Sequence, residues 1–156
     1  MGLDYSINLR VKNIKENTIH EIELAYWRKC YGIRDCLHSL ITKLGKSVNG
    51  DDYESICSTR HFSKIIEALL KEMADLDSDL WSDSLWGAAI TRNITYENLK
   101  VLSQMQDIFS SPSPQRRKEK FLDIVDDSLL PQEIIEHMAL IDWEHSLFEI
   151  VSYNSY

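Results

Sequence analysis

The sequence lacks the patterns that build the best-known catalytic and binding motifs. Only five of its 156 residues are glycine, and they never cluster, so there is no glycine-rich phosphate-binding loop. No serine stands in the Gly-x-Ser-x-Gly turn of a hydrolase nucleophile. No apolar run approaches the ~20 residues that a membrane-spanning helix needs. We therefore predict no membrane span and no nucleotide site of the common kinds.

Cysteine is scarce as well. Cys30, Cys36 and Cys57 form an odd set without a Cys-x-x-Cys pair. A secreted domain of this size usually carries an even and denser disulfide framework. We therefore predict reduced thiols and a cytoplasmic location, with no metal site on these residues.

Metal-binding and cofactor-binding patterns are also missing. No two histidines have the spacing of a His-x-x-x-His or His-Glu-x-x-His helix. The acidic stretch at residues 75–79 has Leu80 and Trp86 where a calcium loop needs Gly and Glu. The sequence thus predicts neither a metal nor a cofactor. The five histidines are His20, His38, His61, His137 and His145.

Positively charged residues are fewer than negatively charged ones. The 17 Lys and Arg residues face 25 Asp and Glu residues, which gives a formal net charge of −8. Binding to a nucleic-acid duplex depends on neutralising phosphates with cations, so we do not expect it. The one basic cluster could meet a phosphate or an acidic partner, although aspartates close behind it favour simple solvent exposure. It consists of Arg116, Arg117, Lys118 and Lys120.

The chain opens with two stretches in which apolar and polar residues alternate, as in strands with one buried face. A polar segment at residues 12–17 separates them, so we predict a β-hairpin. The apolar positions are Leu3, Tyr5, Ile7, Leu9 and Val11 in the first stretch and Ile22, Leu24 and Tyr26 in the second.

Helical spacing of apolar residues follows the hairpin. It predicts a first helix that ends before Gly45, and a second helix with its cap at Ser58 or Thr59. Thr95 is the predicted cap of a third helix, and prolines predict a break at residues 110–114. The predicted helices cover residues 25–44, 59–76, 95–109, 114–126 and 131–141.

Three further segments read as strands, at residues 53–57, 85–91 and 147–153, whereas residues 46–52 read as a loop. The last strand is apolar, β-branched or aromatic at most positions, as in a strand buried on both faces. A hairpin followed by helices and then a strand predicts a single α+β domain over residues 1–156. We expect a small antiparallel or mixed sheet with about five helices packed mainly on one side.

Three segments stand out together. Met1-Gly2-Leu3-Asp4 leads into a strand, Tyr26-Trp27-Arg28-Lys29 stands at the start of a predicted helix, and residues 152–156 are aromatic and serine-bearing. Together they resemble a family of small proteins encoded by bacterial phages and prophages. The chain differs from that family at Arg34, Asp35 and Cys36, where members often have a His-Asn-Trp-like trio. The resemblance implies an origin in a phage or mobile element and no particular reaction.

The block Tyr26-Trp27-Arg28-Lys29 combines residue types that dominate the binding energy of protein interfaces. It predicts Trp27, Arg28 and Lys29 as partner-binding residues. The alternative is that the aromatic rings belong to the core and that Arg28 pairs with Glu21 or Glu23.

Asp4 is the one catalytic candidate. It stands on the polar face of the first strand, where it could meet Arg28 or His20 across the hairpin. Such a contact would form a small polar site, or it would only pair two strands.

The sequence favours a non-enzymatic interaction module of phage or mobile-element type that binds a host or phage protein, as a monomer or homodimer. Aromatic and charged residues are plentiful, whereas no catalytic spacing is found. Two alternatives stay open. One is a small enzyme built around Asp4, Arg28 and a histidine, and the other is an acidic inhibitor that occupies another protein's nucleic-acid-binding site.

Overall fold

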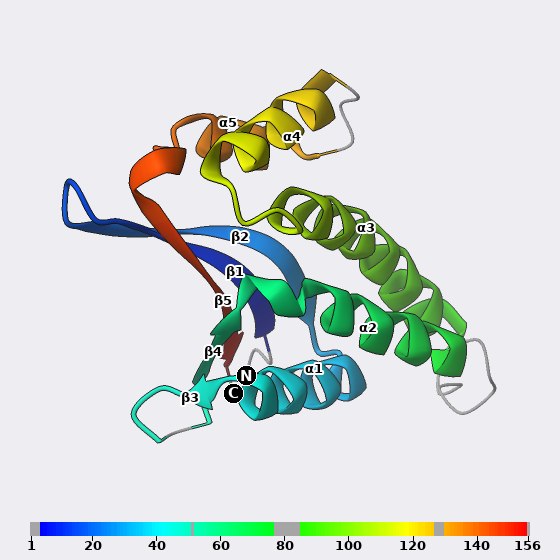
Figure 1. Cartoon of the computed structure of the whole chain (residues 1–156). Coiled ribbons are helices and arrows are strands. Elements are labelled where there is room, and N and C mark those ends of the chain that lie inside the picture. Colours follow the sequence, from blue (N-terminus) through cyan, green and yellow to red (C-terminus); the bar gives the residue numbers. More distant parts are fainter. Residues whose placement is uncertain (1–3, 51, 77–84, 127–129, 156) are drawn as a thin grey trace.

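Strands from the two ends of the chain meet in one sheet, while most of the helices lie between them in the sequence (Figure 1). The computed structural model describes residues 4–50, 52–76, 85–126 and 130–155. The predicted α+β class is confirmed. The strands are β1 (Asp4–Asn13), β2 (Thr18–Arg28), β3 (Lys46–Ser47), β4 (Glu54–Ser58) and β5 (Ser146–Asn154), the helices are α1 (Tyr31–Leu44), α2 (Phe62–Leu76), α3 (Leu85–Phe109), α4 (Pro114–Asp126) and α5 (Gln132–Ala139), and the 3-10 turns are η1 (Thr59–His61) and η3 (Trp143–His145).

The five described strands form an antiparallel sheet in the order β2-β1-β5-β4-β3. The C-terminal strand β5 lies between β1 and β4, and at its centre Ile150, Val151 and Ser152 are all completely buried. Its prediction as a strand buried on both faces is therefore confirmed at the centre. The short strand β3 occupies a segment predicted as loop, because its two residues pair with β4.

The alternation in β1 holds throughout the described strand, and every second residue from Tyr5 to Asn13 is buried. In β2 the alternation changes phase. Register shifts between Ile7 and Asn8 of β1, so Leu24 of β2 has no Cα partner and forms a β-bulge. Beyond this bulge Ala25 and Trp27 point into the core, and Tyr26, predicted to be buried, is exposed.

The helix predicted from residue 25 begins six residues later, which corrects the sequence-based boundary. Tyr26 and Arg28 still belong to β2, because they pair with Ser6 and Asp4 of β1. The chain then turns at Lys29, whose φ of 58° lies in the left-handed region, and α1 starts at Tyr31. The Tyr26-Trp27-Arg28-Lys29 block therefore ends a strand and does not start a helix.

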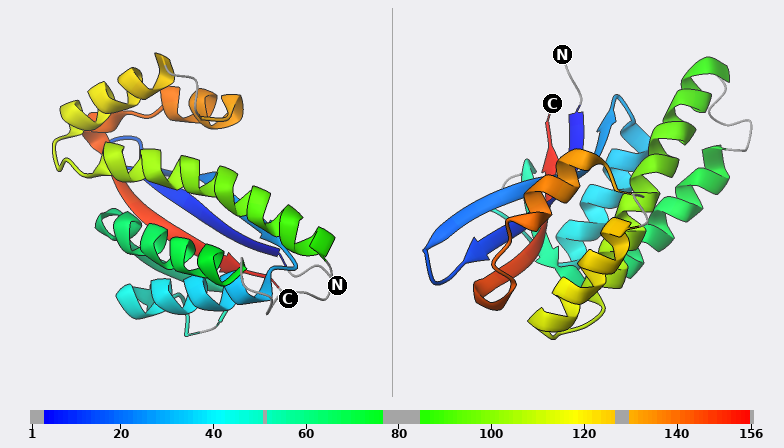
Figure 2. Two further views of the ribbon diagram at one scale, coloured as in Figure 1. Left: turned by 90° about the vertical axis from the view of Figure 1, so that its right-hand side faces the viewer. Right: turned by 90° about the horizontal axis from the view of Figure 1, so that it is seen from above.

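Helices α1, α2 and α3 lie side by side across one face of the sheet (Figures 1 and 2). The apolar stripe predicted for α2 provides Phe62, Ile65 and Leu69 to the core, while Leu70 is exposed. Gly45 ends α1, as predicted, and a Cβ on it would lie 1.8 Å from the Ile56 carbonyl oxygen. A glycine at this point therefore lets α1 approach β4 closely.

The strand predicted at residues 85–91 is wrong, because α3 runs without interruption from Leu85 to Phe109. Thr95, predicted as a helix cap, lies inside α3. Its hydroxyl donates to the Thr91 carbonyl at 2.7 Å and accepts the indole N–H of Trp27 at 3.0 Å. A buried partner on β2 thus explains a threonine in mid-helix. The predicted break at residues 110–114 is confirmed, and α4 and α5 follow it at one end of the molecule (Figure 1).

Candidate functional site

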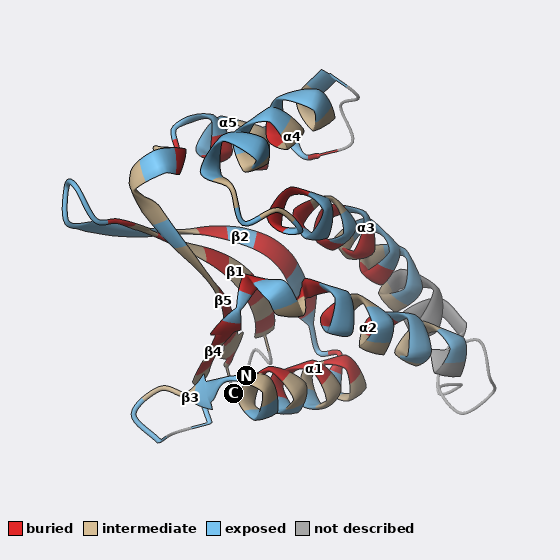
Figure 3. Cartoon of the chain, viewed as in Figure 1, coloured by how far each residue is buried: buried red, intermediate tan, exposed pale blue. Residues whose placement is uncertain are grey.

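The face of the sheet turned away from α1, α2 and α3 is lined by polar and charged side chains. Because side chains alternate along a strand, the partly exposed residues of β1, from Asp4 to Lys12, share this face. Figure 3 shows the buried and partly exposed positions alternating along the strands. We call this surface the open face.

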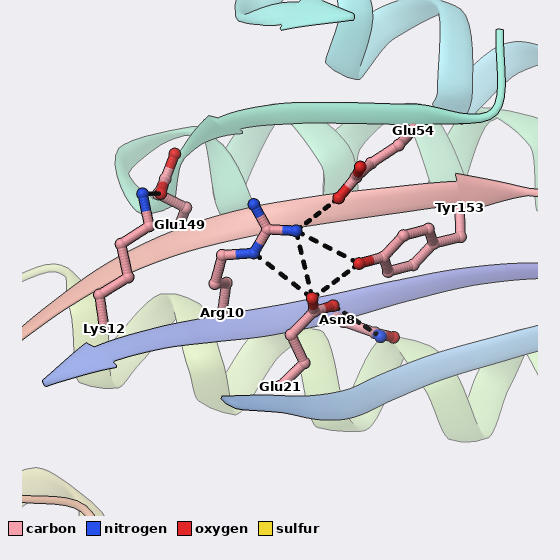
Figure 4. Close-up of polar contacts among 7 residues, drawn as sticks. All are labelled: Asn8, Arg10, Lys12, Glu21, Glu54, Glu149 and Tyr153. Atoms are coloured by element: carbon pink, nitrogen blue, oxygen red, sulfur yellow. Dashed lines mark hydrogen bonds and ion pairs between the residues drawn. The ribbon is translucent and has the colours of Figure 1, made fainter. Parts of the chain in front are cut away.

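An ion-pair network lies at the centre of the open face (Figure 4). Arg10 on β1 donates to Glu21 on β2 at 3.2 Å and also to Glu54 on β4. The Tyr153 hydroxyl on β5 donates to Glu21 at 2.6 Å and accepts from Arg10 at 3.3 Å. Asn8 completes the group by donating to Glu21 at 3.2 Å. One guanidinium therefore links four strands.

These contacts shift the pKa values of both central groups. Burial alone would lower the pKa of Arg10, but its bonds to Tyr153, Glu54 and Glu21 raise it overall. Burial and the bond to Glu21 raise the pKa of Tyr153 above its usual range. Both groups thus keep their protons at ordinary pH, and the hydrogen bonds between them stay the same. Arg10 is already paired with both carboxylates, so we interpret the network as a rigid support for the sheet and not as a reactive site.

At one end of the open face, Asp4, Tyr26 and Arg28 lie together. Asp4 is the Cα partner of Arg28, and a hydrogen bond from the Tyr26 hydroxyl to Asp4 raises the pKa of Tyr26. Asp4 Oδ1 is buried without a hydrogen-bond partner among the described atoms, and no ion pair there joins Asp4 to Arg28. Tyr26 is 40% exposed and Arg28 is exposed. We call these three residues the Asp4 corner.

Of the residues predicted to bind a partner, Trp27 is placed in the core. Its ring is completely buried and stacks on Tyr5, with the two ring centroids 5.8 Å apart, and its indole N–H donates to the Thr95 hydroxyl. Trp27 cannot touch a partner in this conformation, which corrects its assignment. Arg28 and Lys29 are exposed, as a binding role requires.

The strand register also places His20 away from Asp4 and Arg28, the other residues of the enzymatic alternative. Asp4 and Arg28 are directly opposite, as considered from the sequence, but His20 is opposite Val11, near the other end of the hairpin. His38 lies on the helix-covered face, where its Nδ1 is 2.7 Å from Ser152 Oγ. Neither histidine therefore reaches Asp4.

Sequence reasoning missed the buried polar chain around Ser152. Its Oγ is 2.7 Å from both the Tyr5 hydroxyl and His38 Nδ1, beneath α1. A serine beside a histidine is the pairing of an activated nucleophile. Ser152 is completely buried, however, so a substrate cannot reach it in this conformation. Alternation in β1 and β5 places these groups in the core, but only the strand order brings them together.

The basic cluster is partly used inside the molecule. Arg117 donates to the Ser111 carbonyl at 2.7 Å and its guanidinium lies 5.2 Å from the Phe109 ring centroid. Burial lowers the pKa of Arg117. Lys120 donates to Ser110 Oγ at 2.7 Å. These two cations hold the turn between α3 and α4, whereas Arg116 and Lys118 are exposed on α4.

Metal sites and membrane spans were also considered from the sequence. The described residues contain no group of three or more His, Cys, Asp or Glu side chains placed to hold a metal ion. None of the described helices has the length and apolar character required to cross a membrane. Met1, Gly2 and Leu3, and residues 77–79 of the acidic stretch, lie outside the described residues.

Comparison with protein-family models, curated proteins and solved structures gives no match. The resemblance to phage-encoded proteins therefore stays a prediction.

Proposed function

We propose that the protein is a non-enzymatic interaction module, of phage or mobile-element type, that binds a host or phage protein through the Asp4 corner. The observation that carries the proposal is the unused bonding capacity at this corner. Asp4 Oδ1 has no hydrogen-bond partner among the described atoms, and Arg28 forms no ion pair with it although the two are opposite. That oxygen is itself covered in this conformation, so the groups at the corner that a second protein can reach are the exposed Tyr26, Arg28 and Lys29.

The rest of the open face supports this role. The Arg10 network fixes four strands, so the Asp4 corner is held on a rigid element, which lowers the entropic cost of binding. Tyr26, Arg28 and Lys29 supply an exposed aromatic ring and two cations. Tyrosine and arginine are enriched among residues that dominate interface energies.

Site-specific photo-crosslinking tests the proposal. A benzoylphenylalanine at Tyr26 would place the crosslinker in the Asp4 corner, and the same residue at exposed Leu70 on α2 is the control. In a lysate of the organism that encodes the chain, we expect a discrete adduct from position 26 and none from position 70. Arg28→Ala should remove the adduct. Identical adducts from both positions would contradict the proposal.

A further inference from the structure

A groove runs beside β2, at the edge of the sheet and next to the open face. β2 is the outermost strand in the described sheet, and both α3 and α5 contact it. Two hollows of about 300 Å³ and 180 Å³ lie there. Leu24, Asn98 and Pro131 line both of them, so the two hollows form one groove.

The floor of the groove is apolar. Leu24, Val101 and Ile134 line it, and each of these side chains is at least nine-tenths buried. Asn98 of α3 donates from its side-chain amide to the Tyr26 carbonyl at 3.0 Å, which satisfies one outward-facing group of the edge strand. The groove thus offers an aliphatic contact surface along a strand edge, where peptide segments commonly bind.

The rim of the groove is acidic. Glu23 of β2 and Glu133 of α5 both line the smaller hollow, and Glu97 of α3 lines the larger one. Glu97 forms an exposed ion pair with Lys100, but Glu23 and Glu133 form none within the described residues. Burial and the charge of Glu133 raise the pKa of Glu23. Two carboxylates that repel each other in this way would both be stabilised by a cation between them.

We propose that this groove binds a segment of a partner protein in which Lys or Arg side chains stand beside aliphatic ones. The cations meet Glu23 and Glu133, and an aliphatic side chain covers Leu24 and Ile134. The net charge of −8 attracts such a segment from a distance. The inference rests on the proposed interaction function, but it concerns the adjacent groove, which shares Tyr26 with the Asp4 corner, and it names the chemistry of the partner.

Fluorescence anisotropy with a labelled synthetic peptide tests the groove. The probe is a short peptide in which Lys alternates with Leu and Ser, and a peptide with Glu in place of Lys is the control probe. We expect saturable binding of the Lys peptide only. The double variant E23Q/E133Q should weaken this binding by roughly tenfold or more, because both cation contacts are lost.

A matched variant separates the groove from general attraction to an acidic protein. E119Q/E144Q removes the same amount of charge from the hollow between α4 and η3. It should change the affinity by less than about twofold, since long-range attraction alone is screened by salt. Equal losses in the two double variants, wild-type affinity in E23Q/E133Q, or no saturable binding would each overturn the inference.

Thermal melting should show E23Q/E133Q as stable as the wild type, because the substitution removes a repulsion. Should that variant unfold, Glu133→Lys alone, at the exposed start of α5, must weaken the Lys peptide in the same way. Absence of peptide binding together with an adduct at Tyr26 that depends on Arg28 would leave the proposed function standing. Peptide binding without an adduct that depends on Arg28 would instead remove the Asp4 corner.

Discussion

Two polar clusters built on the same strands, β1 and β5, differ in almost every property. On the helix-covered face Tyr5, Ser152 and His38 form a chain of neutral groups beneath α1. On the open face Arg10 and Tyr153 belong to a network of full charges. Burial decides between them, since a charge in the core is costly and a half-exposed charge remains partly solvated. Both clusters therefore stabilise the fold. The Asp4 corner is neither a buried neutral cluster nor a closed network of charges, so we assign it to function.

The largest effect should come from the helix-covered side. Trp27→Ala removes a completely buried ring that stacks on Tyr5 and bonds to Thr95. We expect a loss of about 3–5 kcal/mol in the free energy of unfolding, measured by urea denaturation. Leu70→Ala on the exposed side of α2 is the control and should change it little. A small cost for Trp27→Ala would return this residue to the candidates for partner binding.

Ser152→Ala tests the neutral cluster itself. It leaves the Tyr5 hydroxyl and His38 Nδ1 buried without their shared partner. We expect a loss of about 2–3 kcal/mol in the free energy of unfolding, because unsatisfied buried groups keep their desolvation cost. Ser155→Ala, in the partly exposed C-terminal segment, is the control. If Ser152→Ala were neutral, the chain of hydrogen bonds would not contribute to stability.

Arg10→Met tests the charged network. It leaves Glu21 and Glu54 facing Tyr153 without a cation, and we expect a loss of about 1–2 kcal/mol, less than for the fully buried cluster. Adding Glu54→Gln to Arg10→Met should restore part of the loss, as measured in a double-mutant cycle. Strictly additive effects would show that the two side chains do not interact.

Acidification should weaken the neutral cluster. Burial lowers the pKa of His38 below its ordinary 6.5, and neighbouring Asp52 offsets this only in part. The unfolded chain therefore takes up this proton at a higher pH than the folded chain. Stability should fall as the pH drops below about 6.5, with a slope of up to about 1.4 kcal/mol per pH unit.

Urea denaturation between pH 5 and 8 measures that slope, and His38→Gln should reduce it. Burial and the nearby cations Arg60 and Lys64 also lower the pKa of His61, which therefore contributes in the same direction. His61→Gln therefore measures this second contribution, and His38→Gln in the His61→Gln background isolates the contribution of His38. An unchanged slope in His38→Gln would assign the pH dependence to other groups.

The sequence predicted features that depend on local spacing. The alternation in β1, the stripe of α2, Gly45 and the break before α4 were all read from residues close together in the chain. The helix predicted over residues 95–109 is present, but the part of α3 before Thr95 was missed, because Thr95 resembles a cap, whereas its hydroxyl bonds to Trp27, 68 residues away. A contact at that distance leaves no local pattern.

The candidate site was predictable only in part. Polar positions in the first two strands placed Asp4 near Arg28, and a hairpin register also brings Arg10 to Glu21. The bulge at Leu24 could not be foreseen, because it depends on the pairing with β1, and it is what buries Trp27 and exposes Tyr26. The contributions of Glu54 and Tyr153 required the strand order, in which β5 inserts between β1 and β4.

The smallest effect on stability, and the sharpest on function, should come from Arg28→Ala. Arg10 and Arg28 both arise from the hairpin and face the same side, but Arg10 is held by two carboxylates and exposed Arg28 forms no ion pair with Asp4. Exposed substitutions of this kind usually change stability by less than about 0.5 kcal/mol. Binding to the partner captured at Tyr26 should weaken by about 2 kcal/mol or more, as at interface hot spots.

Asp4→Asn separates the remaining alternatives in the same assay. A binding corner predicts weaker partner binding with the fold intact, because the carboxylate that accepts the Tyr26 hydroxyl bond and lies opposite Arg28 loses its charge. A small enzyme around Asp4 and Arg28 predicts that a turnover found for the wild type disappears in Asp4→Asn at unchanged stability. If Arg28→Ala and Asp4→Asn both unfold the protein, the two residues pair strands β1 and β2 and neither functional assignment holds. Among the described atoms Asp4 Oδ1 has no hydrogen-bond partner, which favours the first outcome, since an ion pair with Arg28 that joined the strands would already satisfy it.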